Sequence, residues 1–98
     1  MIKKNYSKKG TSCRTTFRYY PEEENSINTV ALLGEFSEWQ PIEMSQRKDG
    51  SFSTTLSLEA GKSYQFRYLV DDNKWLNEKE ADSYVYSPFG SQNAVIEL

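Results

Sequence analysis

Seven carboxylates lie in the expected turns and polar loops of this chain, and a pair of carboxylates is what hydrolysis of a glycosidic bond requires. They are Glu35, Glu38, Asp71, Asp72, Glu78, Glu80 and Asp82. Such a pair must lie roughly 5–9.5 Å apart across a cleft. Carboxylates in turns usually cap the backbone or remain solvated, and a domain of 98 residues offers little depth for a cleft that excludes water. We therefore expect a protein without catalytic residues, not an enzyme.

Other catalytic and metal sites lack their usual residues. The chain has no histidine, which is the commonest general base and metal ligand. Its single cysteine, Cys13, falls on the apolar face of an expected strand, where a buried and unreactive thiol is the usual outcome. No Cys/His cluster suits zinc, and no acidic loop has the regularly spaced oxygen ligands of a calcium site. The sequence therefore predicts no metal and no cofactor.

Aromatic and polar residues supply the chemistry of binding. The chain has seven Tyr, five Phe and two Trp. The candidate ligand-binding residues include two tryptophans just beyond strand ends, Trp39 and Trp75, and two polar residues on outward strand faces, Arg67 and Asn93. Two residues of the loop before Asn93, Phe89 and Ser91, complete the set. A flat aromatic ring beside directional hydrogen-bonding groups suits a sugar, whose C–H face is apolar and whose rim hydroxyls need partners.

Each of these residues also has an ordinary structural alternative. A tryptophan in a β-sandwich is most often part of the core. Arg67 alone would most often pair with a charge on a neighbouring strand, and Asn93 alone would most often lie in a turn. In the stretch GEFSEW, residues 34–39, we expect Gly34 to make the turn and Phe36 to pack inward, which leaves Trp39 as a platform.

Short alternating segments must position these residues. The runs CRTTFRYY, SFSTTLSL and SYQFRYLV alternate with the period of a strand, and Asp49-Gly50 and Gly61 mark turns between them. In the third run, Tyr64, Phe66 and Tyr68 share one face, so Arg67 points to the other. About seven short strands with no helical periodicity predict an all-β sandwich of two sheets. A five-stranded barrel of the oligonucleotide-binding type is the alternative.

Length and charge predict a single domain with little general attraction to nucleic acid or membranes. We expect one domain over residues 12–98, preceded by a flexible basic arm over residues 1–11 that contains four lysines. The formal charge is −2, which gives little general attraction to nucleic acid or anionic lipid. The start lacks the apolar stretch of a secretory signal, and no run is long enough to span a bilayer. We therefore expect a cytoplasmic protein.

Four segments together resemble a known family. The runs VALLGEFSEWQP, KDGSF, YQFRYLVDDNKW and PFGSQNAVIEL resemble the glycogen-binding modules of the AMP-activated protein kinase β-subunit. They are similar also to the early-set domains that precede the barrel in isoamylases and glycogen branching enzymes. The resemblance covers roughly residues 12–98 and implies an immunoglobulin-like sandwich that binds α-1,4-glucan.

The resemblance also implies a role for each candidate residue. It implies that Trp39 and Trp75 stack on sugar rings and that Phe89 reaches over or through the glucan. Hydroxyl groups would be bound by Arg67, where the kinase module has lysine, and by Ser91 and Asn93. The turn DDNK is longer than that of the kinase module, which leaves the position of Trp75 relative to Trp39 open.

Two functions of different kinds follow. The first is a standalone, non-catalytic module that binds glycogen, starch or maltooligosaccharide. The alternative is a protein-interaction or regulatory module that docks on a glycogen-metabolising enzyme or self-associates through a sheet edge. Binding of single-stranded nucleic acid on the aromatics is disfavoured by the acidic balance.

Overall fold

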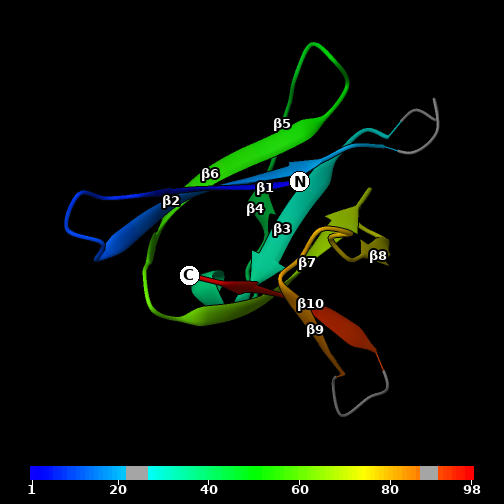
Figure 1. Cartoon of the computed structure of the whole chain (residues 1–98). Coiled ribbons are helices and arrows are strands. Elements are labelled where there is room, and N and C mark those ends of the chain that lie inside the picture. The colour runs from blue at the N-terminus through cyan, green and yellow to red at the C-terminus, as the bar shows by residue number, and fades with distance from the viewer. Residues whose placement is uncertain (22–26, 87–90) are drawn as a thin grey trace.

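The computed structural model describes residues 1–21, 27–86 and 91–98, which form two antiparallel β-sheets (Figure 1). One sheet has four strands in the order β1-β2-β6-β5. The other has six, in the order β4-β3-β7-β10-β9, with β8 also paired to β7. The predicted all-β sandwich is therefore confirmed.

The strands are short, as the turn spacing indicates. The four-stranded sheet consists of β1 (Ile2–Tyr6), β2 (Ser12–Tyr19), β5 (Ser45–Gln46) and β6 (Phe52–Glu59). The six-stranded sheet consists of β3 (Val30–Gly34), β4 (Ile42–Glu43), β7 (Ser63–Val70), β8 (Lys74–Leu76), β9 (Ser83–Tyr86) and β10 (Gln92–Glu97). A 3₁₀ turn, η1 (Glu35–Ser37), follows β3. The excess over about seven predicted strands comes from pieces of two or three residues and from the N-terminal strand.

The core forms where the inward faces of the two sheets meet. On β2, Phe17 is fully buried, and on β7, Phe66 and Tyr68 are fully buried. The rings of Phe17 and Phe66 meet edge to face with their centroids 5.1 Å apart, a geometry that aromatic quadrupoles favour. Because alternate residues of a strand face opposite ways, this packing of Phe66 and Tyr68 fixes Arg67 on the outer face of the six-stranded sheet.

The run IEMSQR, residues 42–47, crosses between the sheets. Its first part, β4, pairs with β3, and its second part, β5, pairs with β6. Met44 lies at the crossing, only 4% exposed, and its backbone N–H donates to the carbonyl of Val30 at 2.9 Å. The long apolar side chain fills the core at the point where the backbone changes sheet.

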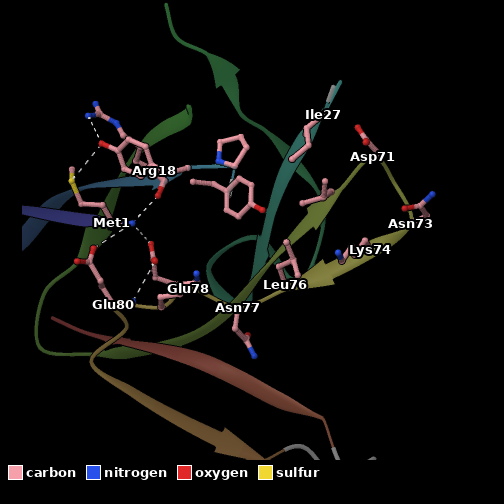
Figure 2. Close-up of a pocket in the computed structure, with 15 residues that line it drawn as sticks. Met1, Arg18, Ile27, Asp71, Asn73, Lys74, Leu76, Asn77, Glu78 and Glu80 are labelled. Carbon is pink, nitrogen blue, oxygen red and sulfur yellow. Dashed lines mark hydrogen bonds and ion pairs between the residues drawn. The ribbon is translucent and has the colours of Figure 1, made fainter. Parts of the chain in front are cut away.

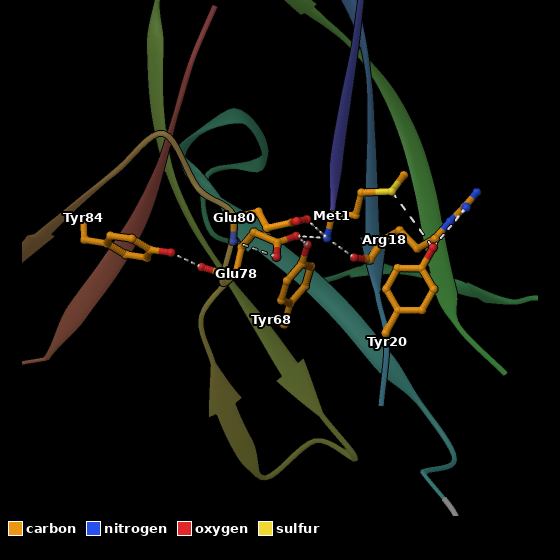
Figure 3. A network of polar contacts seen from close by, with 7 residues as sticks. All are labelled: Met1, Arg18, Tyr20, Tyr68, Glu78, Glu80 and Tyr84. Atoms are coloured by element: carbon orange, nitrogen blue, oxygen red, sulfur yellow. Dashed lines mark hydrogen bonds and ion pairs between the residues drawn. The ribbon is translucent and has the colours of Figure 1, made fainter. Parts of the chain in front are cut away.

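The expectation of a flexible arm over residues 1–11 is wrong, because Ile2–Tyr6 form β1 in register with β2. The amino group of Met1 donates to Glu78 Oε1 and to the carbonyl of Arg18, and Glu78 is 5% exposed (Figure 3). Lys4 Nζ forms an ion pair with Asp82 Oδ2 at 2.8 Å. Sequence reasoning missed the contacts with Glu78 and Asp82 because these partners lie more than seventy residues away along the chain.

No helix in the described part of the chain has the length and apolar character needed to cross a membrane.

Candidate functional site

Strand register brings three of the predicted site residues onto the outer face of the six-stranded sheet. Arg67 on β7 lies opposite Leu33 of β3. Since Ala94 of β10 pairs with Phe66 of β7, the preceding residue, Asn93, falls beside Arg67 on the same face. Trp75 of β8 pairs with Leu69, two residues further along β7. Residues from β7, β8 and β10 thus converge, and their contact with a ligand stays a prediction.

Arg67 is held by an indole and a carbonyl, and it makes no ion pair with any other described residue. Its guanidinium carbon lies 5.8 Å from the centroid of the Trp75 ring, within range of a cation–π contact. Its Nε and Nη2 donate to the carbonyl of Gln92 at 3.3 and 3.1 Å. These contacts, among described residues, leave Nη1 for a ligand.

Asn93 pairs with a residue that was not among the sequence-predicted site residues. Its Nδ2 donates to Gln65 Oε1 at 3.1 Å. The pairing leaves Asn93 Oδ1 as an acceptor and Gln65 Nε2 as a donor on the same face. The alternation of β7 could have identified Gln65, because it shares a face with Arg67.

Asn77 joins β8 to β10 across a gap in the sheet. One edge of β7 is divided between these two strands, because β10 pairs with residues 63–66 and β8 with residues 68–70. At the division, Asn77 Nδ2 donates to the carbonyl of Gln92 at 2.6 Å, and Asn77 Oδ1 accepts from the N–H of Ala94 at 3.2 Å. A side-chain amide therefore takes the place of a backbone partner. The Gln92 carbonyl that anchors Arg67 is thus fixed from both sides.

Position 34 needs a glycine because neighbouring groups leave no room for a side chain, and the chain reverses further along, at Glu38 and Trp39. The φ of −167° at Gly34 is extended, which corrects the expectation that this glycine makes the turn. A Cβ on Gly34 would lie 2.6 Å from Phe36 Cζ and 2.8 Å from the carbonyl oxygen of Gln65. The left-handed residues are Glu38 and Trp39, with φ of 54° and 60°. Phe36 packs against the core as predicted, 5.5 Å from the ring of Phe17.

Trp39 is held at the end of β3 with its side chain 38% exposed. Its backbone N–H donates to the carbonyl of Gly34 at 2.9 Å. Beside it, Glu35 Oε1 accepts from the N–H of Gln65 at 2.6 Å, so that this carboxylate extends the pairing of β3 with β7. Gly34 pairs with Phe66, and Trp75 pairs with Leu69. The residues of β7 paired with Gly34, which anchors Trp39, and with Trp75 therefore lie three positions, about 10 Å, apart along the strand.

Two buried apolar residues lie beneath this outer face. Leu33 is 7% exposed and Val95 is 6% exposed, although neither belongs to the main core cluster between the sheets. Leu33 pairs with Arg67 and Val95 pairs with Gln65, so both point outward with these polar side chains. They give the face an apolar floor and shield the hydrogen bonds above it from water.

The remaining two predicted residues lie in or near the loop between β9 and β10. Ser91 is partly buried directly before β10. Phe89 lies outside the described residues.

A pocket lies beside β2, β7 and β8 (Figure 2). It encloses about 840 Å³ and is lined by residues such as Ile27, Leu76 and Glu78. Asn77 lines it from the side of the β8–β10 junction, whereas Arg67, Trp75 and Asn93 do not line it. Because Leu76 follows Trp75 on β8, the two side chains point to opposite faces. The outer face that carries Arg67, Trp75 and Asn93, here called the aromatic face, is therefore separate from this pocket.

Comparison with known proteins assigns the family. Residues 15–98 match the family described as the glycogen recognition site of AMP-activated protein kinase. The chain belongs to this glycogen-recognition family. The resemblance stated from the sequence is thereby confirmed, and the chain is a module of a carbohydrate-binding family. No curated protein matches the sequence.

The fold of this glycogen-recognition module recurs in a solved enzyme structure. The crystal structure of ferric enterobactin esterase from Salmonella typhimurium matches with a TM-score of 0.79 and 11% sequence identity. The match covers 99% of this chain and 34% of that chain. At this identity the likeness shows the fold alone, and the module spans about a third of the length of the esterase chain.

Proposed function

We propose that this chain is a non-catalytic module that binds α-1,4-glucan of the glycogen or starch type on the outer face of its six-stranded sheet. The observation that carries the proposal is the arrangement around Arg67. Its guanidinium lies against the exposed indole of Trp75, beside the amides of Asn93 and Gln65. This is an apolar platform with polar groups at its rim, which is the combination that a sugar ring requires.

The polar groups have complementary tasks at the rim of the ring. Arg67 Nη1 and Gln65 Nε2 donate to hydroxyl oxygens, and Asn93 Oδ1 accepts from a hydroxyl. Because the Gln92 carbonyl and the Trp75 ring already hold Arg67, little side-chain freedom is lost when sugar binds. On the strength of the family resemblance, Ser91 and Phe89 are proposed as further contacts from the loop before β10.

The area of the platforms sets the expected affinity. Trp75 is 47% exposed and Trp39 is 38% exposed. If each ring removes about 100 Å² of apolar surface from water, the two contribute about 5 kcal/mol. Association costs roughly 4–15 kcal/mol, so short oligosaccharides bind in the micromolar to millimolar range. A polysaccharide presents many equivalent segments, which raises its apparent affinity.

Native affinity electrophoresis tests the proposal directly. The parent protein should be retarded in gels that contain glycogen or amylose, and Trp75→Ala should remove the retardation while the protein stays folded. Tyr6→Ala is the matched control, because Tyr6 is also 47% exposed but lies on β1 of the other sheet. The proposal fails if no α-glucan retards the parent, or if Tyr6→Ala loses retardation as completely as Trp75→Ala.

A further inference from the structure

The two sheets carry opposite formal charges. Residues 1–20 and 45–59, which contain all of the four-stranded sheet, hold eight basic and two acidic residues. The described remainder holds four basic and nine acidic residues. The net charge of −2 is therefore the sum of +6 on the segments that contain the four-stranded sheet, −5 on the described remainder, and three further glutamates in the segment 22–26.

The outer face of the four-stranded sheet, here called the basic face, combines cations with neutral hydrogen-bonding groups. Strand register places these residues on it: Lys3, Asn5, Arg14, Thr16, Arg18, Ser53, Thr55 and Ser57. The two acidic residues nearby already have partners. Asp49 Oδ1 accepts from the N–H and Oγ of Ser51, and Glu59 forms an ion pair with Lys62 at 3.0 Å.

The cations of the basic face have few acceptors of their own. Within the described chain, Lys3, Arg14 and Arg18 form no ion pair. Arg18 Nη1 donates only a long bond of 3.4 Å to the hydroxyl of Tyr20. Its Nε is buried and has no hydrogen-bond partner among the described residues. A ligand on the surface cannot reach this buried Nε, so the Nη groups of Arg18 are the donors available to an incoming acceptor.

The spacing along β2 suits carboxylates. Arg14, Thr16 and Arg18 point to the same side at intervals of about 6.7 Å, which is also the repeat of alternate side chains in an extended peptide. The planar fork of arginine binds a carboxylate through two parallel hydrogen bonds. The hydroxyls of Thr16 and Thr55, which lie 3.0 Å apart across the strands, add donors between the two arginines.

Other occupants fit the basic face less well. Single-stranded nucleic acid needs a series of aromatic side chains on which successive bases stack, whereas the eight residues of this face include none and Tyr20, beside Arg18, adds a single ring at its end. A membrane surface needs apolar side chains to insert, and these are also missing from it. A second copy of the chain fits less well, because four of the nine carboxylates in its described remainder already serve internal contacts: Glu35, Asp71, Glu78 and Asp82.

We propose that the basic face docks an extended acidic segment of another protein, with carboxylates at alternate positions. The aromatic face belongs to the other sheet and points the opposite way, so both faces can be occupied together. A protein with such an acidic segment would be brought to whatever polymer the aromatic face holds. This docking is argued from the charges and register of the four-stranded sheet, so it can be tested independently of glucan binding.

Fluorescence anisotropy tests the docking with a labelled peptide of alternating glutamate and serine. We expect saturable binding that weakens steeply with salt, and about a fivefold loss of affinity in Arg14→Gln/Arg18→Gln. The control, Lys74→Gln/Lys79→Gln, removes the same charge from β8 and the β8–β9 turn, outside the basic face, and should change affinity less than twofold. Both double variants should keep the parent's retardation on glycogen.

Amide chemical shifts provide the second readout. With the same peptide, the shifts should concentrate on β1, β2 and β6. The proposal is overturned if the peptide does not bind, if the control pair weakens binding as much as the arginine pair, or if the shifts centre on β7 and β10. It is also overturned if oligothymidylate or vesicles containing phosphatidylserine bind the basic face more tightly than the peptide.

Discussion

Replacing Asn77 with alanine removes the side-chain amide that joins β8 to β10. Two hydrogen bonds disappear: Nδ2 to the Gln92 carbonyl at 2.6 Å, and Oδ1 to the Ala94 N–H at 3.2 Å. A typical hydrogen bond contributes about 0.5–1.5 kcal/mol net, and a buried donor left without an acceptor costs about 1–3 kcal/mol. Ala94 is fully buried, so we expect a loss of roughly 2–3 kcal/mol in the free energy of unfolding.

Urea denaturation followed by tryptophan fluorescence measures this loss. Asn73→Ala is the matched control, because Asn73 is an exposed residue of the β7–β8 turn and uses its backbone N–H to bond Val70. Its unfolding free energy should lie within about 0.5 kcal/mol of the parent. In thermal melts, Asn77→Ala should fall by on the order of 10 °C.

Glucan binding should weaken together with stability in Asn77→Ala. The Gln92 carbonyl loses one of the groups that fix it, and the same carbonyl orients Arg67. Maltoheptaose titrations at a temperature where the variant is fully folded separate this effect from unfolding. The reasoning is refuted if Asn77→Ala unfolds like Asn73→Ala, or if the folded variant binds maltoheptaose as tightly as the parent.

Three further changes have defined outcomes. Gly34→Ala should destabilise the fold by about 1–3 kcal/mol in urea denaturation, because its Cβ meets Phe36 and the Gln65 carbonyl; an unchanged midpoint would contradict this. Arg67→Leu, which keeps some packing against the indole, should weaken maltoheptaose binding about tenfold by loss of charge-assisted hydrogen bonds, and unchanged affinity would count against the site. Burial, followed by the nearby Glu78 carboxylate, raises the pKa of Tyr68 well above 10.0. The folded state therefore keeps a proton that the unfolded state loses, so this contribution to stability is complete below about pH 10 and declines above it. Tyr68→Phe should lose less stability than the parent between neutral and strongly alkaline pH, and identical pH profiles would refute the assignment.

The alternation of β7 made much of the fold and part of the site predictable. Phe66 and Tyr68 could only face the core, and Arg67 between them could only face outward. The same reasoning extends to Asn93 and Gln65, because strand pairing keeps partners on one face. These inferences need only the period of a strand and the apolar character of its residues.

Contacts between distant segments could not be predicted in this way. Asn77 sits in an irregular run, and its importance comes from where β10 happens to end its pairing with β7. The lysines near the N-terminus suggested a solvated arm. The sequence could not show that Lys4 pairs with Asp82, because Asp82 lies far along the chain. Gly34 resembled a turn residue, and only the positions of the Phe36 ring and the Gln65 carbonyl show why a side chain is excluded there.

The divided edge of β7 gives the aromatic face a rigid side and a compliant side. The strands β3, β7 and β10 share registers of four or five paired residues, whereas β8 has three and no described strand on its other edge. Trp75 therefore rests on a part of the sheet that opens more easily than β3, β7 and β10, and its amide should exchange with deuterium sooner than theirs. On the proposed glucan, this freedom would let the indole adjust to a sugar ring while the Gln92 carbonyl holds Arg67.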